Sequence, residues 1–268
     1  MLRIETRNLT LGYSHNTVVR DIGFALEPGR MAGLVGPNGC GKSTIIKAIS
    51  RVISPLSGSI TLNGRDVAHI PHMELARLLG VVPQIPLLPS TFTAFEVVLM
   101  GRNPHLGLFQ YEGPKDMEIA WQAMEKMRIQ HLSGRRIAEL SGGEIQCVVI
   151  DRVLAQETQG ILLDEPTSNL DIGRQIEVLD LMKELCRSRG LTVGVALHDL
   201  NLAVEYCDYL ILLHNGGIKT VGAPAEVVTQ GNISEVYGAG SVVYSIDGLP
   251  AILPRAGSSA GGRFKESA

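Results

Sequence analysis

The spacing of hydrophobic positions divides the chain into segments of different kinds. Polar and apolar residues alternate from Leu2 to Leu11 and again from Ile60 to Leu62, before the turn pair Asn63-Gly64. Because successive side chains of a strand point to opposite faces, this alternation predicts an antiparallel sheet near the N-terminus. Residues 85–158 carry apolar side chains at helical spacing and no convincing strand, so we expect an inserted helical region there.

A second pattern, in which strands and helices alternate, predicts a parallel sheet. The apolar run Met31–Val35 precedes a glycine-rich turn and a helical pattern from Ser43 to Ile53. Beyond residue 160 the expected elements are strand 161–163, helix 172–189, strand 191–197, helix 200–207 and strand 209–213. The strand segments are almost continuously apolar, which is typical of parallel strands that helices cover on both faces.

Composition narrows the class of protein. Of the 268 residues 45% are hydrophobic and 19% charged, a balance typical of a globular protein. The net charge is −3, so no general attraction to nucleic acid is expected. The first ten residues lack the features of a secretory signal, and no run approaches the ~20 apolar residues that cross a bilayer. Any role at a membrane is therefore expected to come through a partner.

Residues 36–44, with the sequence GPNGCGKST, fit the pattern of a phosphate-binding loop. The loop follows a predicted strand and opens a predicted helix, which is the context that the motif requires. Its backbone N–H groups can turn toward one anion, Lys42 can reach the β- and γ-phosphates, and the Ser43 hydroxyl can ligate Mg²⁺. The expected nucleotide-binding residues are Gly36, Pro37, Asn38, Gly39, Cys40, Gly41, Lys42, Ser43 and Thr44.

Polar residues also follow two other predicted strands. Asp164 and Glu165 come after strand 161–163, and His198 comes after strand 191–197. Asp164 is placed to hold the metal, Glu165 to polarise the water that attacks the γ-phosphate, and His198 to contact that phosphate. Alone, Asp-Glu-Pro after a strand is more often a solvated turn and a single histidine is more often structural. The phosphate-binding loop shifts both interpretations toward function.

A second surface suited to phosphate begins at residue 140. The sequence LSGGE opens a helix, with Ser141 as the expected N-cap and two glycines that leave backbone N–H groups free. One nucleotide needs a single phosphate cradle, so the second cradle is expected to serve a nucleotide held by another molecule. An ordinary capped helix is the alternative, and these residues alone do not exclude it.

In this order the motifs resemble those of the ATP-binding subunit of ABC transporters, from about Thr6 to Gly222. The resemblance implies that Tyr13 stacks on adenine and that Gln84 senses metal or water and links the site to the helical insert, which receives a short permease helix. It also implies that two copies of the chain enclose two ATP molecules. The residues that each copy would present to the nucleotide of the other are Ser141, Gly142, Gly143, Glu144 and Asp171.

The resemblance also implies chemistry and partners. The expected catalytic residues are Lys42, Gln84, Glu165 and His198, and Mg²⁺ bound with ATP would be held by Ser43, Gln84 and Asp164. The expected partners are a second copy of the chain, transmembrane permease subunits and, indirectly, a periplasmic or surface substrate-binding protein. This arrangement would place the chain at the cytoplasmic face of the cell membrane. No nucleic-acid partner is expected.

Three stretches resemble the subgroup that imports ferric siderophores, haem and cobalamin: 78–84 (LLGVVPQ), 98–105 (VLMGRNPH) and 198–203 (HDLNLA). A single cassette without membrane spans favours an importer subunit over an exporter or an ATPase of translation or DNA repair. The alternative is a nucleotide-binding regulatory cassette, or a soluble ABC ATPase with weak hydrolysis that is not coupled to transport. It is motivated by Glu144, Cys147 and Asp151, which replace the usual Gln, Arg and Ala; a buried charge at 151 requires a partner such as Arg152.

Pattern and resemblance together predict an α/β fold, with a P-loop NTPase (RecA-like) core, an antiparallel β subdomain and an inserted helical subdomain. Residues 1–250 are expected to form one ABC ATPase domain, with 1–84 and 159–250 as the catalytic core and 85–158 as the helical subdomain that carries the LSGGE motif. Residues 251–268 are expected to form an unstructured tail, since the chain beyond Pro254 is rich in Gly, Ser and Ala.

Overall fold

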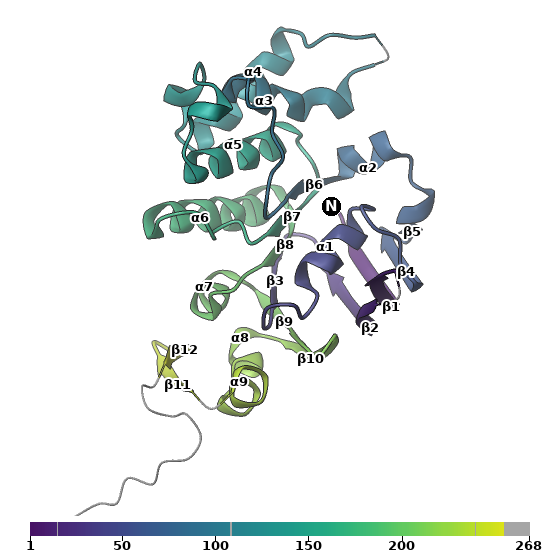
Figure 1. The fold of residues 1–268 in the computed structure, drawn as a ribbon, viewed down its shortest axis with the longest axis vertical. Helices are drawn as coiled ribbons and strands as arrows, with labels where there is room; N and C mark the ends of the chain where they lie inside the picture. The colour runs from purple at the N-terminus through teal and green to yellow at the C-terminus, as the bar shows by residue number, and fades with distance from the viewer. Residues whose placement is uncertain (15, 108, 239, 255–268) are drawn as a thin grey trace, which may run out of the picture.

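A six-stranded sheet in the order β10-β9-β3-β8-β7-β6 runs through the centre of the structure (Figure 1). The structure is a computed structural model and describes residues 1–14, 16–107, 109–238 and 240–254. Five strands are parallel, and β10 is antiparallel to β9. The strands are β3 Met31–Val35, β6 Leu79–Val82, β7 Gly160–Asp164, β8 Thr192–Ala196, β9 Tyr209–His214 and β10 Gly217–Gly222. Every residue of β3, β7 and β8 is buried, as their apolar sequences predict.

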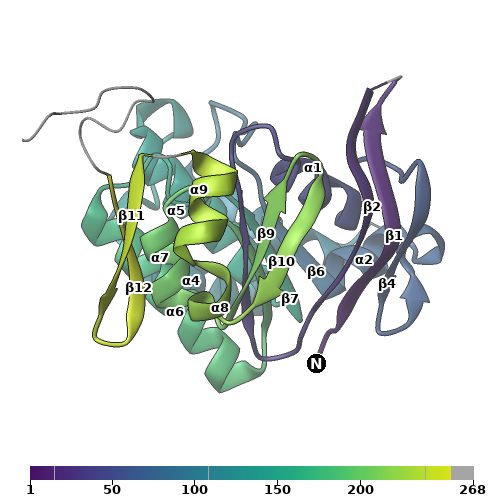
Figure 2. The same ribbon diagram turned by 90° about the horizontal axis from the view of Figure 1, so that it is seen from below.

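The antiparallel sheet predicted near the N-terminus is present, with the strand order β2-β1-β4-β5. Its strands are β1 Ile4–Tyr13, β2 Asn16–Leu26, β4 Ser57–Leu62 and β5 Arg65–Asp66. Figure 2 shows this sheet beside the central sheet, and α1 (Lys42–Ile49) contacts strands of both. One hydrophobic core joins Leu11 of β1, Ile45 of α1 and Leu34 of β3. The packing fixes α1, and with it the preceding loop, between the two sheets.

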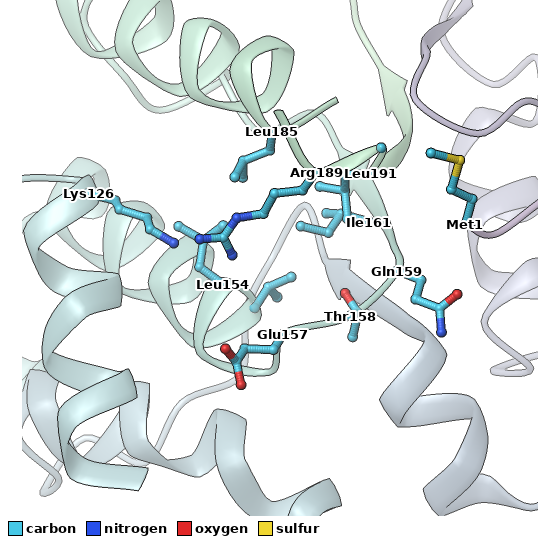
Figure 3. A pocket seen from close by; sticks show the side chains of 12 residues that line it. Met1, Lys126, Leu154, Glu157, Thr158, Gln159, Ile161, Leu185, Arg189 and Leu191 are labelled. Atoms are coloured by element: carbon cyan, nitrogen blue, oxygen red, sulfur yellow. The ribbon is translucent and has the colours of Figure 1, made fainter. Parts of the chain in front are cut away.

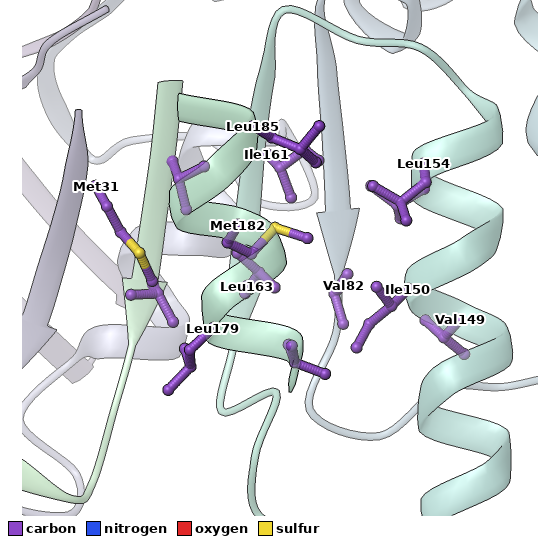
Figure 4. Close-up of a cluster of buried hydrophobic side chains, with 14 of the residues drawn as sticks. Met31, Val82, Val149, Ile150, Leu154, Ile161, Leu163, Leu179, Met182 and Leu185 are labelled. Atoms are coloured by element: carbon purple, nitrogen blue, oxygen red, sulfur yellow. The ribbon is translucent and has the colours of Figure 1, made fainter. Parts of the chain in front are cut away.

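Helices cover the opposite face of the central sheet. Helices α6 Ile172–Arg189 and α7 Leu200–Tyr206 contact its strands, and α5 Gly142–Ala155 contacts the edge strand β6. Helices α3 Ala94–Leu99 and α4 Pro114–Lys126 pack on α5, while α2 His72–Leu78 precedes β6. The core on this side brings Met182 of α6, Leu163 of β7 and Ile150 of α5 together (Figure 4). Helices α3, α4 and α5 pack on one another, in agreement with the expected helical insert.

The stretch 98–105 contains a buried arginine that joins this helical region to the sheet. Arg102, in the 3-10 segment Met100–His105, is only 5% exposed. It donates to the Ala155 carbonyl oxygen at 2.8 Å, to Glu157 Oε2 at 2.9 Å and to Asp116 Oδ1 at 3.0 Å. These bonds connect α4 and the end of α5 at the point where the chain enters β7.

The end of one helix and the presence of one strand differ from the sequence prediction. The first helix ends at Ile49 rather than Ile53, because the Ser50 hydroxyl donates to the Ile46 carbonyl oxygen at 2.9 Å and Arg51 adopts a φ of 59°. The pattern also gives no sign of the edge strand β6, which is too short to show a period.

The C-terminal region contains elements that the pattern does not predict. They are α8 Pro224–Val227, α9 Gln230–Tyr237, β11 Ser241–Ile246 and β12 Leu249–Pro254. The expected unstructured tail is therefore wrong for residues 251–254, which pair with β11. This strand is stabilised by packing against α7, a contact that composition cannot reveal. Residues 255–268 lie outside the described residues.

Asp151 on α5 is a buried carboxyl without a hydrogen-bond partner. Its exposed fraction is 0%, and neither carboxyl oxygen is hydrogen-bonded within the described ranges. Burial raises its pKa well above the ordinary value, and the charge of Lys126 on α4 acts in the opposite direction. The partner expected from the sequence, Arg152, forms no ion pair with Asp151 in this part of the chain.

Replacing Asp151 by alanine should stabilise the protein. We expect the free energy of unfolding to rise by about 1–3 kcal/mol near pH 8, because an unpaired buried polar group is removed. The native-state pKa is raised above 3.8, so the carboxyl destabilises the fold progressively as the pH rises from about 4 toward that raised value. Urea unfolding at pH 5 and pH 8 should therefore show a larger gain at pH 8. Glu125→Ala, at an exposed position on α4, is the control; an equal gain at both pH values would contradict this explanation.

Candidate functional site

The phosphate-binding loop lies between β3 and α1, and its backbone conformation requires glycine. Gly36 has a φ of 149°, and a Cβ there would lie 2.4 Å from the Leu213 carbonyl oxygen. Lys42 is 5% exposed, and its ammonium group donates to the carbonyl oxygens of Gly36 at 2.8 Å and Pro37 at 3.2 Å. The loop therefore wraps around its own lysine, which brings the positive charge to the phosphate cradle.

Two oxygen ligands that suit Mg²⁺ meet at the start of α1. The Ser43 hydroxyl donates to Asp164 Oδ1 at 2.9 Å, although the two residues are 121 positions apart. Burial raises the pKa of Asp164, and the bond from Ser43 opposes this shift. No group of three or more His, Cys, Asp or Glu among the described residues is placed to hold a metal. Because Mg²⁺ at such sites takes several ligands from phosphate and water, this hydroxyl–carboxylate pair fits it.

Glu165 stands at the junction of three strand ends. It has a left-handed backbone with a φ of 51°, which is uncommon for a residue other than glycine and turns the chain sharply at the end of β7. Gln84, after β6, donates from Nε2 to Glu165 Oε2 at 2.6 Å. His198, after β8, brings its Nε2 into contact with Glu165 Oε1. The Glu165 side chain is thus contacted on both sides and is only 9% exposed.

These residues line one hollow of about 550 Å³. Its lining is Val18, Asn38, Gly39, Gly41, Lys42, Ser43, Thr44, Gln84, Glu165 and His198. The structure therefore brings the expected loop, Gln84, Glu165 and His198 together around one space. Asp164 lies directly behind Ser43.

An adjoining hollow of about 670 Å³ includes residues that sequence reasoning did not assign. Besides loop residues 37–40 it is lined by Asn16, Thr17, Val18, Arg20, His214, Asn215, Gly216 and Val236. The pair Asn215-Gly216 signals a turn in the sequence, but its position beside the loop follows only from the pairing of β9 with β3. Tyr13 is 44% exposed and lines neither hollow, so its adenine contact stays a prediction.

Ser141 caps α5 as expected. The Ser141 hydroxyl accepts from the Glu144 backbone N–H at 3.3 Å, and Glu144 Oε2 accepts from the Ser141 backbone N–H at 2.7 Å. The bonds that Glu144 Oε2 accepts from the Ser141 backbone N–H and from the Ser141 hydroxyl lower the pKa of Glu144, and Arg135 donates to Oε1 at 3.2 Å. The carboxylate that replaces the usual glutamine is therefore used by the cap and balanced by an arginine.

The Ser141 surface forms a separate hollow of about 510 Å³. Its lining is Ile129, His131, Leu132, Ser141, Gly142, Gly143, Glu144, Cys147, Asn169, Leu170, Asp171 and Arg174. The five residues expected to act across a dimer thus lie together. Among the described residues this hollow shares no lining residue with the one that contains Lys42 and Glu165. Burial raises the pKa of Cys147 to about 11, which keeps this thiol neutral at the edge of the surface.

A cavity of about 120 Å³ lies elsewhere, between α5, α6 and the start of β7. Figure 3 shows the Lys126 and Arg189 side chains pointing toward one another above Leu154. Burial, and then the charge of Arg189, lower the pKa of Lys126. None of the site residues predicted from the sequence lines this cavity.

Comparison with known proteins identifies the family. The sequence model of the ABC transporter family matches residues 19–168. The chain belongs to the ABC transporter family. It is 40% identical, over 94% of both chains, to the ferric enterobactin transport ATP-binding protein FepC of Escherichia coli (strain K12). It is 39% identical to the hemin import ATP-binding protein HmuV of Bordetella avium (strain 197N), covering 88% of this chain and 92% of that protein.

Solved ABC structures share the fold. An inward-facing ABC transporter assigned to the metal-chelate type matches with a TM-score of 0.81 and 28% identity, covering 95% of this chain and 98% of that one. The ATP-binding cassette MJ0796, solved as a post-hydrolysis dimer bound to ADP and Pi, matches with a TM-score of 0.75 and 26% identity over 82% and 98% of the two chains. Like other members of the family, this ABC chain is an ATPase. In the described part of it, no helix has both the length and the apolar character needed to cross a bilayer.

Glu165→Gln should separate nucleotide binding from hydrolysis. The amide keeps the shape of the side chain but cannot accept a proton, so we expect hydrolysis to fall by about 10² to 10⁴ while ATP affinity changes little. Phosphate release under single-turnover conditions and fluorescent-nucleotide titration measure the two effects. Glu205→Gln, at an exposed position on α7, is the control. Unchanged turnover in Glu165→Gln would show that Glu165 is not the group that accepts a proton from the attacking water.

Proposed function

We propose that the chain is the ATP-binding and ATP-hydrolysing subunit of an ABC importer for iron chelates (siderophores), haem or cobalamin, acting at the cytoplasmic face of the membrane through separate permease subunits. The hollow that contains Lys42 and Glu165 is called the phosphate hollow below. Its separation from the Ser141 surface carries the mechanistic part of the proposal. The cargo class is supported by the ferric enterobactin and hemin proteins to which the chain is similar.

Two copies would complete each site. The phosphate hollow is open, and in the described residues its lining includes no part of the Ser141 surface. A second copy that faces this hollow can supply Ser141, Gly142 and Gly143, whose backbone N–H groups stand at the N-terminus of α5 and favour an anion. Asp171, the N-cap of α6, lies on the same surface and would approach the partner with them.

Each side chain then has a defined task. Lys42 and the loop N–H groups bind the β- and γ-phosphates. Ser43, Asp164 and Gln84 would hold Mg²⁺, which when bound would supply positive charge to the phosphates. Glu165 accepts a proton from the attacking water. Gln84 and His198 contact opposite oxygens of Glu165, so they orient the carboxylate before the reaction begins.

The permease would dock beside Gln84. Ile85 is 77% exposed and Leu87 is 93% exposed, an unusual degree for apolar side chains that follow a site residue. A nearby groove on the helical region is lined by Phe95, Met117, Glu118, Trp121, Gln122 and Glu125. A short amphipathic helix from the permease would bury this apolar surface. Movement of Gln84 would then be transmitted directly to the permease.

ATP should drive Glu165→Gln into a dimer that depends on Ser141. Arginine at position 141 places a long side chain where a partner's phosphates would lie, so Ser141→Arg in the Glu165→Gln background should bind ATP but remain monomeric. Light scattering coupled to size-exclusion chromatography measures this difference. Ser57→Arg, at an exposed position on β4, should still form the dimer. A dimer of the Ser141→Arg variant would contradict the composite site.

Uptake assays test the proposed role in transport. In cells that carry the chain and its permease, Ile85→Ser combined with Leu87→Ser should lower uptake of ferric chelate or hemin about tenfold or more, because each large apolar side chain buried at an interface contributes roughly 1.5–3 kcal/mol. The ATPase activity of the purified variant should stay within about twofold of the original, since neither residue lines the phosphate hollow.

Val52→Ser is the matched control, because Val52 is 70% exposed and follows α1, outside the proposed docking surface. Full uptake by the double variant would overturn the docking surface. ATP hydrolysis by the chain without uptake of any ferric chelate, haem or cobalamin in the presence of its permease would instead favour a regulatory or uncoupled ABC ATPase.

A further inference from the structure

The C-terminal segment from α9 to β12 reaches the nucleotide site at two separate places. The end of α9 lies beside the phosphate-binding loop, since Val236 lines one hollow together with loop residues 37–40. At the other end of the segment, β12 packs against α7, the helix that begins just after His198. Figure 2 shows α9 and the β11–β12 hairpin side by side near α7.

His198 is tied closely to the first turn of α7. Asp199 is the N-cap of this helix, and its Oδ1 accepts from the backbone N–H groups of Asn201 at 2.8 Å and Leu202 at 3.2 Å. A single residue, the capping Asp199, therefore separates His198 from the helix. A change in the position of α7 must move His198, and His198 contacts Glu165.

Two side-chain amides hold the hairpin. Asn201 donates to the Ile252 carbonyl oxygen at 3.2 Å and accepts from the Ile252 backbone N–H at 2.8 Å. On the other strand, Gln230 of α9 accepts from the Val243 backbone N–H at 2.9 Å and donates to the Ser241 carbonyl oxygen at 3.0 Å. Each amide pairs with a strand edge as a neighbouring strand would. The hairpin thereby joins α7 to α9.

Side-chain packing supports the same connection. Val243 and Ile252, which face each other across the hairpin, pack against the main core, as do Leu200, Leu202 and Tyr206 of α7. The hairpin is therefore fixed to α7 by apolar contacts and oriented by the directional bonds of Asn201.

We propose that Asn201 is a positioning residue for ATP hydrolysis: by binding Ile252 it anchors α7 to the C-terminal hairpin and holds His198 against Glu165. At its other end the same segment lies beside the phosphate-binding loop, where Val236 and loop residues 37–40 line one hollow. The hairpin thus sets where His198 stands relative to the bound phosphates. This inference depends on the ATPase activity of the chain and not on the cargo.

The first test is a split between kinetic constants. Asn201→Ala removes both bonds to Ile252, and we expect kcat for ATP hydrolysis to fall roughly tenfold, since small misplacements of a catalytic group have effects of this order or larger. The KM for ATP should stay within about twofold, because the loop contacts are unchanged. Asn201→Asp keeps the acceptor for the Ile252 N–H and should give an intermediate kcat. Glu205→Gln, exposed on the same helix, should leave both constants unchanged.

The second test asks whether the effect passes through His198. In a His198→Ala background, measured under single-turnover conditions, Asn201→Ala should lower the rate no further, because the group that it positions is already gone. An equal fall in both backgrounds, or an unchanged kcat in the original background, would overturn the proposal. A loss of thermal stability with kcat and KM altered together would show a merely structural bond and would overturn it as well.

Discussion

The site depends on the alignment of four adjacent parallel strands. In the order β3-β8-β7-β6, each strand ends at the same edge of the sheet and is followed by one part of the site. The phosphate-binding loop follows β3, His198 follows β8, Glu165 follows β7 and Gln84 follows β6. The register that pairs Leu34 and Asp164 with Ala196 brings these segments to the same level. Because every strand is held by backbone hydrogen bonds to its neighbours, the carboxylate, imidazole and amide meet without long flexible connections.

In the proposed function, hydrolysis would need a second copy, and the same arrangement gives the reason. The sheet edge supplies groups that bind the phosphates from one side, and the helical region holds its N–H groups at α5, in another hollow. In the proposed dimer, closing the site would bring these two surfaces together, and their association would be coupled to a permease at Ile85 and Leu87. In this scheme ATP binding and the movement of a permease are two consequences of one interface.

The unusual residues of α5 have different physical consequences. Glu144 is satisfied by the cap of its own helix and by Arg135, so it adds little uncompensated charge. Asp151 lies in the core with no hydrogen bond among the described residues, and burial is the main cause of its raised pKa. Glu144 is therefore balanced in charge on the surface that the proposed dimer would use, whereas we expect Asp151 to lower the stability of the helix that carries this surface.

The sequence alone determined the local chemistry, because glycine-rich loops, helix caps and buried strands depend on neighbouring residues. The pattern of residues 36–44 predicts the phosphate cradle, Ser141 predicts the cap, and the apolar segments predict β3, β7 and β8. Only the tertiary structure decided which distant groups meet. Three sets of contacts join residues from different elements. Ser43 bonds to Asp164, Gln84 and His198 both contact Glu165, and Asn201 pairs with Ile252. Strand order and helix packing set these contacts, and neither has a period or motif that can be read along the chain.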